Sequence, residues 1–202
     1  MTSACTKSNF RCIYYRMEIV GYDRKAVVEY AKKWAYARNP EYYNFDRIGG
    51  DCTNFASQCL FAGCKIMNFT PEVGWYYRAL NDRAAAWTGV EFFYRFLTGN
   101  VGRIFENAEA DGYAFENVPV RGGIGLGKGP FAVEVPLKRL RIGDFVQLGH
   151  DTGDFYHTPV VVGFLGEVPL LAAHSYDTFD RPLTSYRFER LRCLHVLGVR
   201  KE

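Results

Sequence analysis

A single cysteine stands between a glycine pair and a run of residues with helical spacing. The stretch from Gly49 to Leu60 has the sequence GGDCTNFASQCL, which predicts a tight turn followed by a helix that begins near Cys52. The first N–H groups of a helix are unpaired and form the positive end of its dipole, so they stabilise a thiolate. Asp51 or Thr53 can cap this helix, depending on where its first turn begins. Cys52 is therefore a candidate nucleophile, and the alternative is a buried structural cysteine.

A cysteine nucleophile needs a base that takes its proton, and the chain has only 4 histidines. His157 begins the predicted strand HTPVVVGF, and His174 ends the predicted strand LLAAHSYD. A turn at Gly166 would pair these strands and place both histidines at the same end. We therefore expect His157 to be the general base and His174 to orient it. Asp177 and Asp154 are the alternatives for the orienting residue.

Three helices are predicted in the first half of the chain. Apolar residues at intervals of three and four predict a helix over residues 23–39, which Asn39-Pro40 ends. The helix that begins near Cys52 is predicted to stop at Gly63. A third helix is expected from about Gly89 to Leu97, where Thr88-x-x-Glu91 has the spacing of a capping box. The polar side of the second helix is formed by Asn54, Ser57 and Gln58.

The second half of the chain has the pattern of an antiparallel sheet. From Phe131 onward, runs of Val, Leu and Phe alternate with Gly and Asp turns. Helices followed by strands predict an α+β fold with the helices on one side of the sheet. His150 and His195 lack a comparable context and are predicted to be structural. Residues 99–130 are predicted to form a glycine-rich loop or insertion, and residues 1–16 a peripheral segment.

Composition restricts the class of protein. A chain of 202 residues suits one domain better than two, and a net charge of +3 is too small to indicate nucleic acid or an anionic membrane as a partner. The spacing of the 6 cysteines matches neither a disulfide scaffold nor a zinc site, so we expect no metal and no cofactor. No membrane insertion is expected, and the predicted compartment is the cytoplasm, or the exterior if a leader was removed. The oligomeric state is not encoded in these patterns.

The sequence resembles the putative amidase domain family, which belongs to the papain-like group that includes the NlpC-type cell-wall peptidases of bacteria. The resemblance is carried by GGDCTNFASQCL, the GW and WT pairs, the LRIGDFVQL strand and the HTPVVVG strand. It covers roughly residues 22–190. It implies one papain-like domain over residues 1–202, in which N-terminal helices carrying the cysteine pack against a C-terminal antiparallel sheet carrying the histidine.

The resemblance implies a cysteine amidohydrolase that cleaves a peptide or a peptidoglycan stem peptide through a thioester. In this family pattern Cys52 is the nucleophile, His157 the base and His174 the third polar residue. The Cys52 N–H would stabilise the oxyanion, with a second donor from the loop before it. Two other readings stay open: a non-catalytic binding module, and a metal-dependent hydrolase that uses both histidines and a carboxylate. The candidates for the second donor are Tyr42, Tyr43 and Asn44, and the expected substrate-binding residues are Asp51, Tyr43, Asn44 and Trp75.

Overall fold

The computed structural model describes residues 18–99 and 127–201, so the predictions for residues 1–16 and for most of residues 99–130 lie outside the described residues.

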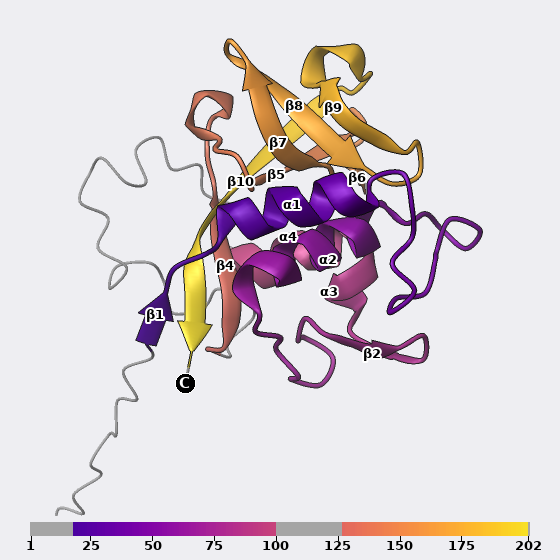
Figure 1. The fold of residues 1–202 in the computed structure, drawn as a ribbon, viewed down its shortest axis with the longest axis vertical. Coiled ribbons are helices and arrows are strands. Elements are labelled where there is room, and N and C mark those ends of the chain that lie inside the picture. Colours follow the sequence, from indigo (N-terminus) through magenta and orange to yellow (C-terminus); the bar gives the residue numbers. More distant parts are fainter. Residues whose placement is uncertain (1–17, 100–126, 202) are drawn as a thin grey trace, which may run out of the picture.

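Helices gather on one side of a large sheet (Figure 1). None of the described helices is long and apolar enough to cross a bilayer. The helices are α1 (Arg24–Trp34), α2 (Cys52–Cys64), α3 (Ala85–Thr88) and α4 (Val90–Thr98), with short 3-10 turns η1 (Leu137–Arg139) and η2 (Leu183–Ser185). The strands are β1 (Glu18–Val20), β2 (Tyr77–Ala79), β3 (Asp82–Arg83), β4 (Gly129–Glu134), β5 (Phe145–Gly149), β6 (Phe155–His157), β7 (Val160–Leu165), β8 (Val168–Ala173), β9 (Thr178–Pro182) and β10 (Arg190–Lys201).

The large sheet has the order β1-β10-β5-β7-β8-β9, with β4 paired to β10 and β6 paired to β5. Every pairing is antiparallel, which confirms the α+β prediction. The predicted hairpin is formed, because Leu165 pairs with Val168 across the turn. The strand expected to begin at His157 is divided, since β6 ends at His157 and Pro159 separates it from β7. Proline has no N–H to donate to the ladder, so the break falls there.

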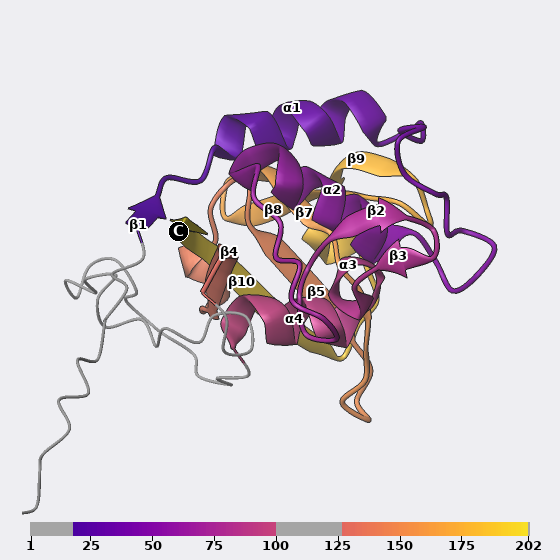
Figure 2. The same cartoon turned by 90° about the horizontal axis from the view of Figure 1, so that it is seen from below.

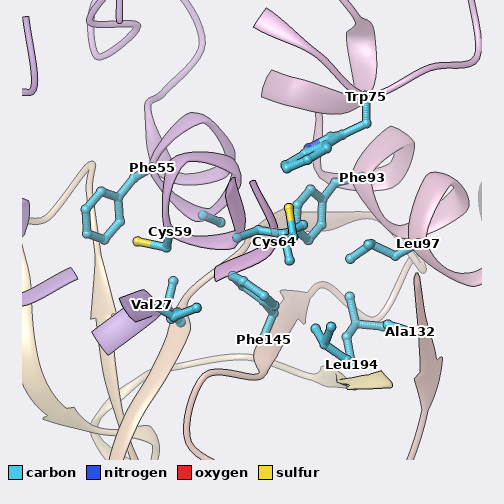
Figure 3. Close-up of a cluster of buried hydrophobic side chains, with 14 of the residues drawn as sticks. Val27, Phe55, Cys59, Cys64, Trp75, Phe93, Leu97, Ala132, Phe145 and Leu194 are labelled. Carbon is cyan, nitrogen blue, oxygen red and sulfur yellow. The ribbon is translucent and has the colours of Figure 1, made fainter. Parts of the chain in front are cut away.

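The sheet buries apolar side chains on both faces, as in a half-barrel. In β7, Val160 and Val162 belong to the cluster between the sheet and the helices, whereas Val161 belongs to a second cluster on the opposite face. This alternation follows from the two-residue period of a strand. Figure 3 shows the first cluster, where Phe145 of β5 lies beneath the helices. The second cluster contains Val133, Val146, Leu148, Val161, Leu171 and Cys193.

Helix α2 is the central helix of the fold. Helix α1 covers it on the outer side, and β7 and β8 lie beneath it (Figure 2). Its polar side is therefore buried as well, and the polar side chains accept hydrogen bonds from two buried tryptophans and one half-buried tyrosine. Those bonds are Trp87 Nε1 to Asn54 Oδ1 at 2.9 Å, Trp75 Nε1 to Ser57 Oγ at 3.0 Å and the Tyr30 hydroxyl to Gln58 Oε1 at 2.7 Å.

The end of α2 differs from the prediction. Gly63 lies inside the helix, which continues to Cys64 and is followed by Lys65 in the left-handed region at φ 56°. A Cβ at position 63 would stand 2.5 Å from Tyr22 Cε2 and 2.6 Å from Val27 Cγ2. Gly63 therefore allows α1 and the residues before it to approach α2 closely, and it does not end the helix.

Helix α1 is shorter than predicted, since it ends at Trp34 and not at Asn39. The Trp34 carbonyl oxygen accepts from Ala37 N at 3.1 Å, which tightens the last turn. The same oxygen also lies 2.9 Å from His174 Nε2. His174, which is distant in the sequence, therefore contacts a carbonyl at the end of α1. The residues near Trp34 in the sequence could not indicate this contact.

The third predicted helix is confirmed as α4, but the capping box is not formed. Gly89 occupies the N-cap of α4, and no side chain caps the helix. Thr88 is the last residue of the short helix α3. The Glu91 carboxylate instead accepts from Arg192 Nη1 of β10 at 2.6 Å. Glu91 therefore ties α4 to the sheet.

Candidate active site

The turn before α2 has the backbone that the glycine pair predicts. Gly49 and Gly50 have φ values of +105° and +99°, which residues with a side chain rarely adopt. Asp51 occupies the N-cap, and the helix begins at Cys52. A Cβ at Gly50 would stand 3.4 Å from Ser175 Oγ. The turn is therefore packed against the residues that follow β8, and it presents Cys52 at the first position of the helix.

Cys52 faces the backbone that flanks His157. Its Sγ lies 3.9 Å from the Tyr156 carbonyl oxygen and 3.8 Å from Thr53 Oγ1. The backbone N–H of Thr158 also acts on the sulfur, and Thr53 Oγ1 donates to Thr158 Oγ1 at 3.2 Å. The start of α2 therefore lies against the backbone on both sides of His157.

Burial dominates the chemistry of the Cys52 thiol. Its side chain is only 7% exposed, and burial raises the pKa of Cys52 above its ordinary value. The N–H of Thr158 and the hydroxyl and N–H of Thr53 act in the opposite direction, while the charge of Asp51 raises the pKa further. Sequence considerations predicted a thiolate stabilised by the helix start. In the structure burial outweighs that effect, so the thiol needs a base to become a nucleophile.

His157 is a buried, neutral imidazole. It is 8% exposed, and burial lowers its pKa to about 4, with the nearby Arg181 charge acting in the same direction. The ring centroid lies 6.0 Å from that of Tyr186 and 6.5 Å from that of Tyr156. Within the described residues its nitrogens make no hydrogen bond, with Cys52 Sγ or with any other group. A neutral ring can accept a proton, which is the property a general base requires.

His174 has partners other than His157. Its Nδ1 lies 2.6 Å from Asp51 Oδ2 and its Nε2 lies 2.9 Å from the Trp34 carbonyl oxygen, while the ring stacks on Phe55 at 3.9 Å. Both ring nitrogens therefore already have hydrogen-bond partners, one of which is a carbonyl oxygen that can only accept. The orienting hydrogen bond expected between the two histidines is therefore not formed.

The two alternative orienting residues are also engaged elsewhere. Asp177 accepts from both terminal nitrogens of Arg38, at 2.8 and 2.9 Å. Asp154 Oδ2 accepts from the Thr152 hydroxyl at 3.3 Å. Neither carboxylate makes a hydrogen bond with His157 in the described residues.

Asp51 is a buried structural carboxylate. It is 0% exposed, and besides His174 it accepts from Phe45 N at 2.9 Å and Asn54 Nδ2 at 2.8 Å. No backbone group of the helix start donates to its side chain. Asp51 thus stands at the predicted N-cap position, but its carboxylate fixes the preceding loop. The predicted contact of Asp51 with substrate stays a prediction.

Arg38 and Ser175 complete this network, and no pattern in the sequence indicated either residue. Arg38 Nη2 lies 2.6 Å from Asp46 Oδ2 and 2.8 Å from Asp177 Oδ1, and its Nε lies 3.6 Å from Asp51 Oδ2. Ser175 Oγ accepts from Asp51 N at 2.7 Å and donates to Asp46 Oδ1 at 3.1 Å. These contacts hold the loop before Cys52 against the turn after β8.

Trp75, another predicted substrate-binding residue, is buried, and its predicted contact with substrate stays a prediction. It is 0% exposed and packs in the core, with its ring centroid 4.9 Å from that of Trp87. Tyr43 is 43% exposed, and Asn44 is also exposed, with its Oδ1 accepting from Asp46 N at 2.9 Å. Both lie in the loop that leads to Cys52, so their predicted contact with substrate stays a prediction.

Existing hydrogen bonds reduce the number of candidates for the second oxyanion donor. Tyr42 N donates to the Asn39 carbonyl at 3.1 Å, and Tyr43 N donates to the Tyr77 hydroxyl at 2.9 Å. Within residues 18–99 and 127–201, the N–H groups of Cys52 and Asn44 have no hydrogen-bond partner. Asn44 is therefore the remaining candidate.

The other histidines have no role at this site. His195 is buried, and its Nδ1 lies 2.7 Å from Asp144 Oδ2, as a structural histidine should. His150 stacks on Tyr156 with centroids 4.4 Å apart and lies in an exposed turn. The described residues contain no group of three or more His, Cys, Asp or Glu side chains arranged to hold a metal ion.

Comparisons with known proteins support one part of the resemblance, the putative amidase domain family. Residues 21–196 match the family described as a putative amidase domain. The chain is 32% identical over 162 residues to the uncharacterized protein YhbB of Bacillus subtilis (strain 168), an alignment that covers 78% of this chain and 42% of that protein. The chain thus spans less than half the length of this relative. No solved structure matches the chain.

Proposed function

We propose that this chain, which belongs to the putative amidase domain family, hydrolyses an amide bond with Cys52 as the nucleophile and His157 as the base. One observation carries the proposal: Cys52 is the first residue of α2, and its Sγ lies 3.9 Å from the Tyr156 carbonyl oxygen, directly before His157. A thiol at a helix start beside a neutral imidazole is the pairing that nucleophilic catalysis by cysteine requires.

The proposed reaction proceeds in two steps. Because the Cys52 thiol and the His157 imidazole are both neutral at rest, the imidazole takes the thiol proton as the sulfur attacks the carbonyl carbon. The imidazolium then protonates the leaving amine as the C–N bond breaks, which leaves a thioester. Water, deprotonated by His157, hydrolyses the thioester and restores the thiol. The imidazole must turn about its side-chain bonds to reach Sγ, a tightening that substrate binding commonly brings.

The oxyanion of each tetrahedral intermediate needs donors near Cys52. The Cys52 N–H has no intrahelical partner because it lies in the first turn of α2. The Asn44 N–H is proposed as the second donor, since the loop that carries it is fixed to α2 by the hydrogen bond from Asn54 Nδ2 to the Tyr43 carbonyl at 3.1 Å. Donors fixed before the reaction lower the barrier because they need no rearrangement.

Peptides or peptidoglycan stem peptides are the proposed substrates, on a domain proposed to be papain-like. The resemblance to cell-wall peptidases points to this class. Two exposed tyrosines support an extended substrate: Tyr43 is 43% exposed in the loop before Cys52, and Tyr176 is 86% exposed beside Ser175, which contacts the same turn. Aromatic side chains of this kind offer broad contact surface at low cost in side-chain entropy.

Soluble peptidoglycan fragments with intact stem peptides provide the test. The wild type is expected to release new amino groups from these fragments, whereas Cys52→Ala and His157→Gln should fall to background. Cys193→Ala is the matched control, because Cys193 is equally buried but lies in the second cluster. Unchanged release by Cys52→Ala would exclude nucleophilic catalysis.

A non-catalytic binding module is the second candidate. It is favoured by the 7% exposure of Cys52 and by the burial that raises the pKa of this thiol, as for a cysteine used only in packing. In that case the wild type would bind the fragments but release no amine, and Cys52→Ala would bind them with the same affinity.

A further inference from the structure

We propose that the Tyr186 hydroxyl positions the His157 imidazole. This inference rests on the proposed function, in which His157 is the base. A base of this kind needs a partner that selects one tautomer and holds the ring. His174, Asp177 and Asp154 were the sequence candidates, and all three are engaged with other groups.

The Tyr186 hydroxyl is buried and makes no hydrogen bond of good geometry within the described residues, although the Arg181 side chain lies close enough to act on it. A buried polar atom without a partner is costly, and such atoms in folded proteins call for an explanation. Tyr186 as a whole is only half-buried. An unused donor and acceptor therefore lies just beneath the surface, at the edge of the second cluster.

His157 lies beside this hydroxyl with ring nitrogens that also lack a partner in the described residues. The two ring centroids are 6.0 Å apart, and the ring planes are inclined at 36°. His157 is paired in register with Leu148, a member of the second cluster against which Tyr186 packs. Both rings thus lie near the end of β6, beside each other, and a hydrogen bond between them requires side-chain rotation.

Arg181 holds the Tyr186 ring in place. Its guanidinium carbon lies 4.0 Å from the Tyr186 ring centroid. The guanidinium is itself fixed by Ser185, since Nε donates to Ser185 Oγ at 2.9 Å and Nη2 donates to the Ser185 carbonyl at 3.1 Å. The tyrosine ring is thus anchored on one side by a cation, and the same guanidinium also acts on the hydroxyl.

The hydroxyl would act through His157 and would not touch the substrate. Its oxygen accepts from one imidazole N–H, which leaves the other nitrogen free to take the Cys52 proton. When the ring becomes an imidazolium, the same hydrogen bond stabilises the positive charge that the neighbouring Arg181 disfavours. Tyr186 is therefore a positioning residue.

The role of Tyr186 can be tested without a known substrate by measuring the rate at which iodoacetamide alkylates Cys52. The rate is measured at several pH values by mass spectrometry of the Cys52 peptide in the wild type, His157→Gln, Tyr186→Phe and Tyr186→Leu. His157→Gln should slow alkylation at neutral pH. Tyr186→Phe should slow it by about tenfold, the scale of one lost hydrogen bond, and Tyr186→Leu should slow it to the same extent. The imidazole 15N shifts should show a single His157 tautomer in the wild type and a mixture in Tyr186→Phe.

The outcomes separate the two proposals. If His157→Gln alkylates as fast as the wild type, the Cys52–His157 pair of the proposed function fails. If His157→Gln is slow but Tyr186→Phe keeps the wild-type rate and a single tautomer, only the role of the hydroxyl is overturned. Slower alkylation in Tyr186→Leu but not in Tyr186→Phe would also overturn the role of the hydroxyl, because that result assigns the effect to ring packing.

Discussion

His174 Nδ1 lies 2.6 Å from Asp51 Oδ2, across 123 positions of sequence, and both side chains are 1% exposed. Asp51 directly precedes Cys52, so this contact fixes the residue from which α2 starts. The other nitrogen of His174 reaches the end of α1 at the Trp34 carbonyl. One side chain therefore connects two helices and the end of β8 beneath the candidate nucleophile.

Removing His174 should destabilise the protein strongly. His174→Ala leaves the buried Asp51 carboxylate without its closest partner, and breaking a buried pair in this way costs about 3–5 kcal/mol. Urea unfolding at neutral pH measures the change. The matched control is His150→Ala, whose side chain is 58% exposed and whose loss should change stability by about 0.5 kcal/mol or less. Equal effects of the two substitutions would contradict the structural role of His174.

The stability of the protein should depend on pH through His157. Its pKa is about 4 in the folded chain, against an ordinary value of 6.5, so the unfolded chain binds the proton first as the pH falls. The contribution of the neutral ring is fully present above pH 6.5 and is lost between pH 6.5 and about 4. We expect on the order of 2 kcal/mol less stability at pH 5 than at pH 7.5 from this group.

His157→Gln isolates that contribution, because it removes this titration and leaves every other group in place. Urea unfolding of both proteins at the two pH values gives the comparison. An equal loss of stability between the two pH values in wild type and variant would show that His157 is not held neutral by the fold.

Gly63 offers a test of the helix packing. Gly63→Ala places a Cβ 2.5 Å from Tyr22 Cε2, and overpacking of this kind typically costs about 1–3 kcal/mol. Gly21→Ala is the control, since nothing lies within 4 Å of a Cβ there. Thermal unfolding compares the two. A gain in stability for Gly63→Ala would contradict the close packing, because such a gain is expected of a helical glycine with free space around it.

The buried hydrogen bond between Trp75 and Ser57 should be revealed by non-additive substitutions. Ser57→Ala strands the Trp75 N–H in the core, which costs about 1–3 kcal/mol. Adding Trp75→Phe removes that unpaired donor, so the double variant should lose less than the sum of the two single variants. Thr184→Ala, at an exposed position, is the neutral control. Strict additivity in a double-mutant cycle would mean that the bond contributes nothing.

Local patterns in the sequence predicted the parts of the site that depend on local structure. The glycine turn, the helix start at Cys52 and the hairpin that turns at Gly166 all follow from residue spacing, and the structure has each of them. The partner of His174 could not be predicted, because Asp51 and Trp34 reach it only once three elements have packed.

The burial of individual side chains could not be predicted from the sequence, and two predictions about the site depended on it. The sequence placed Trp75 at the substrate and gave Cys52 a stabilised thiolate, but both predictions depend on how much of each side chain the rest of the fold covers. Periodicity identifies the apolar face of a helix, and it cannot show that the polar face of α2 is covered too. The strands β1 and β9 were missed for a similar reason, since they are short edge strands of the sheet and contain charged residues.

Capture of the thioester tests the central claim most directly. Wild-type protein is mixed with soluble peptidoglycan fragments, quenched in acid within the first turnovers, digested and analysed by mass spectrometry. We predict an acyl mass increase on the peptide that contains Cys52, absent in Cys52→Ala and retained in Cys193→Ala. Release of amino groups from the fragments with no acyl adduct on Cys52, together with unchanged release by Cys52→Ala, would contradict the account.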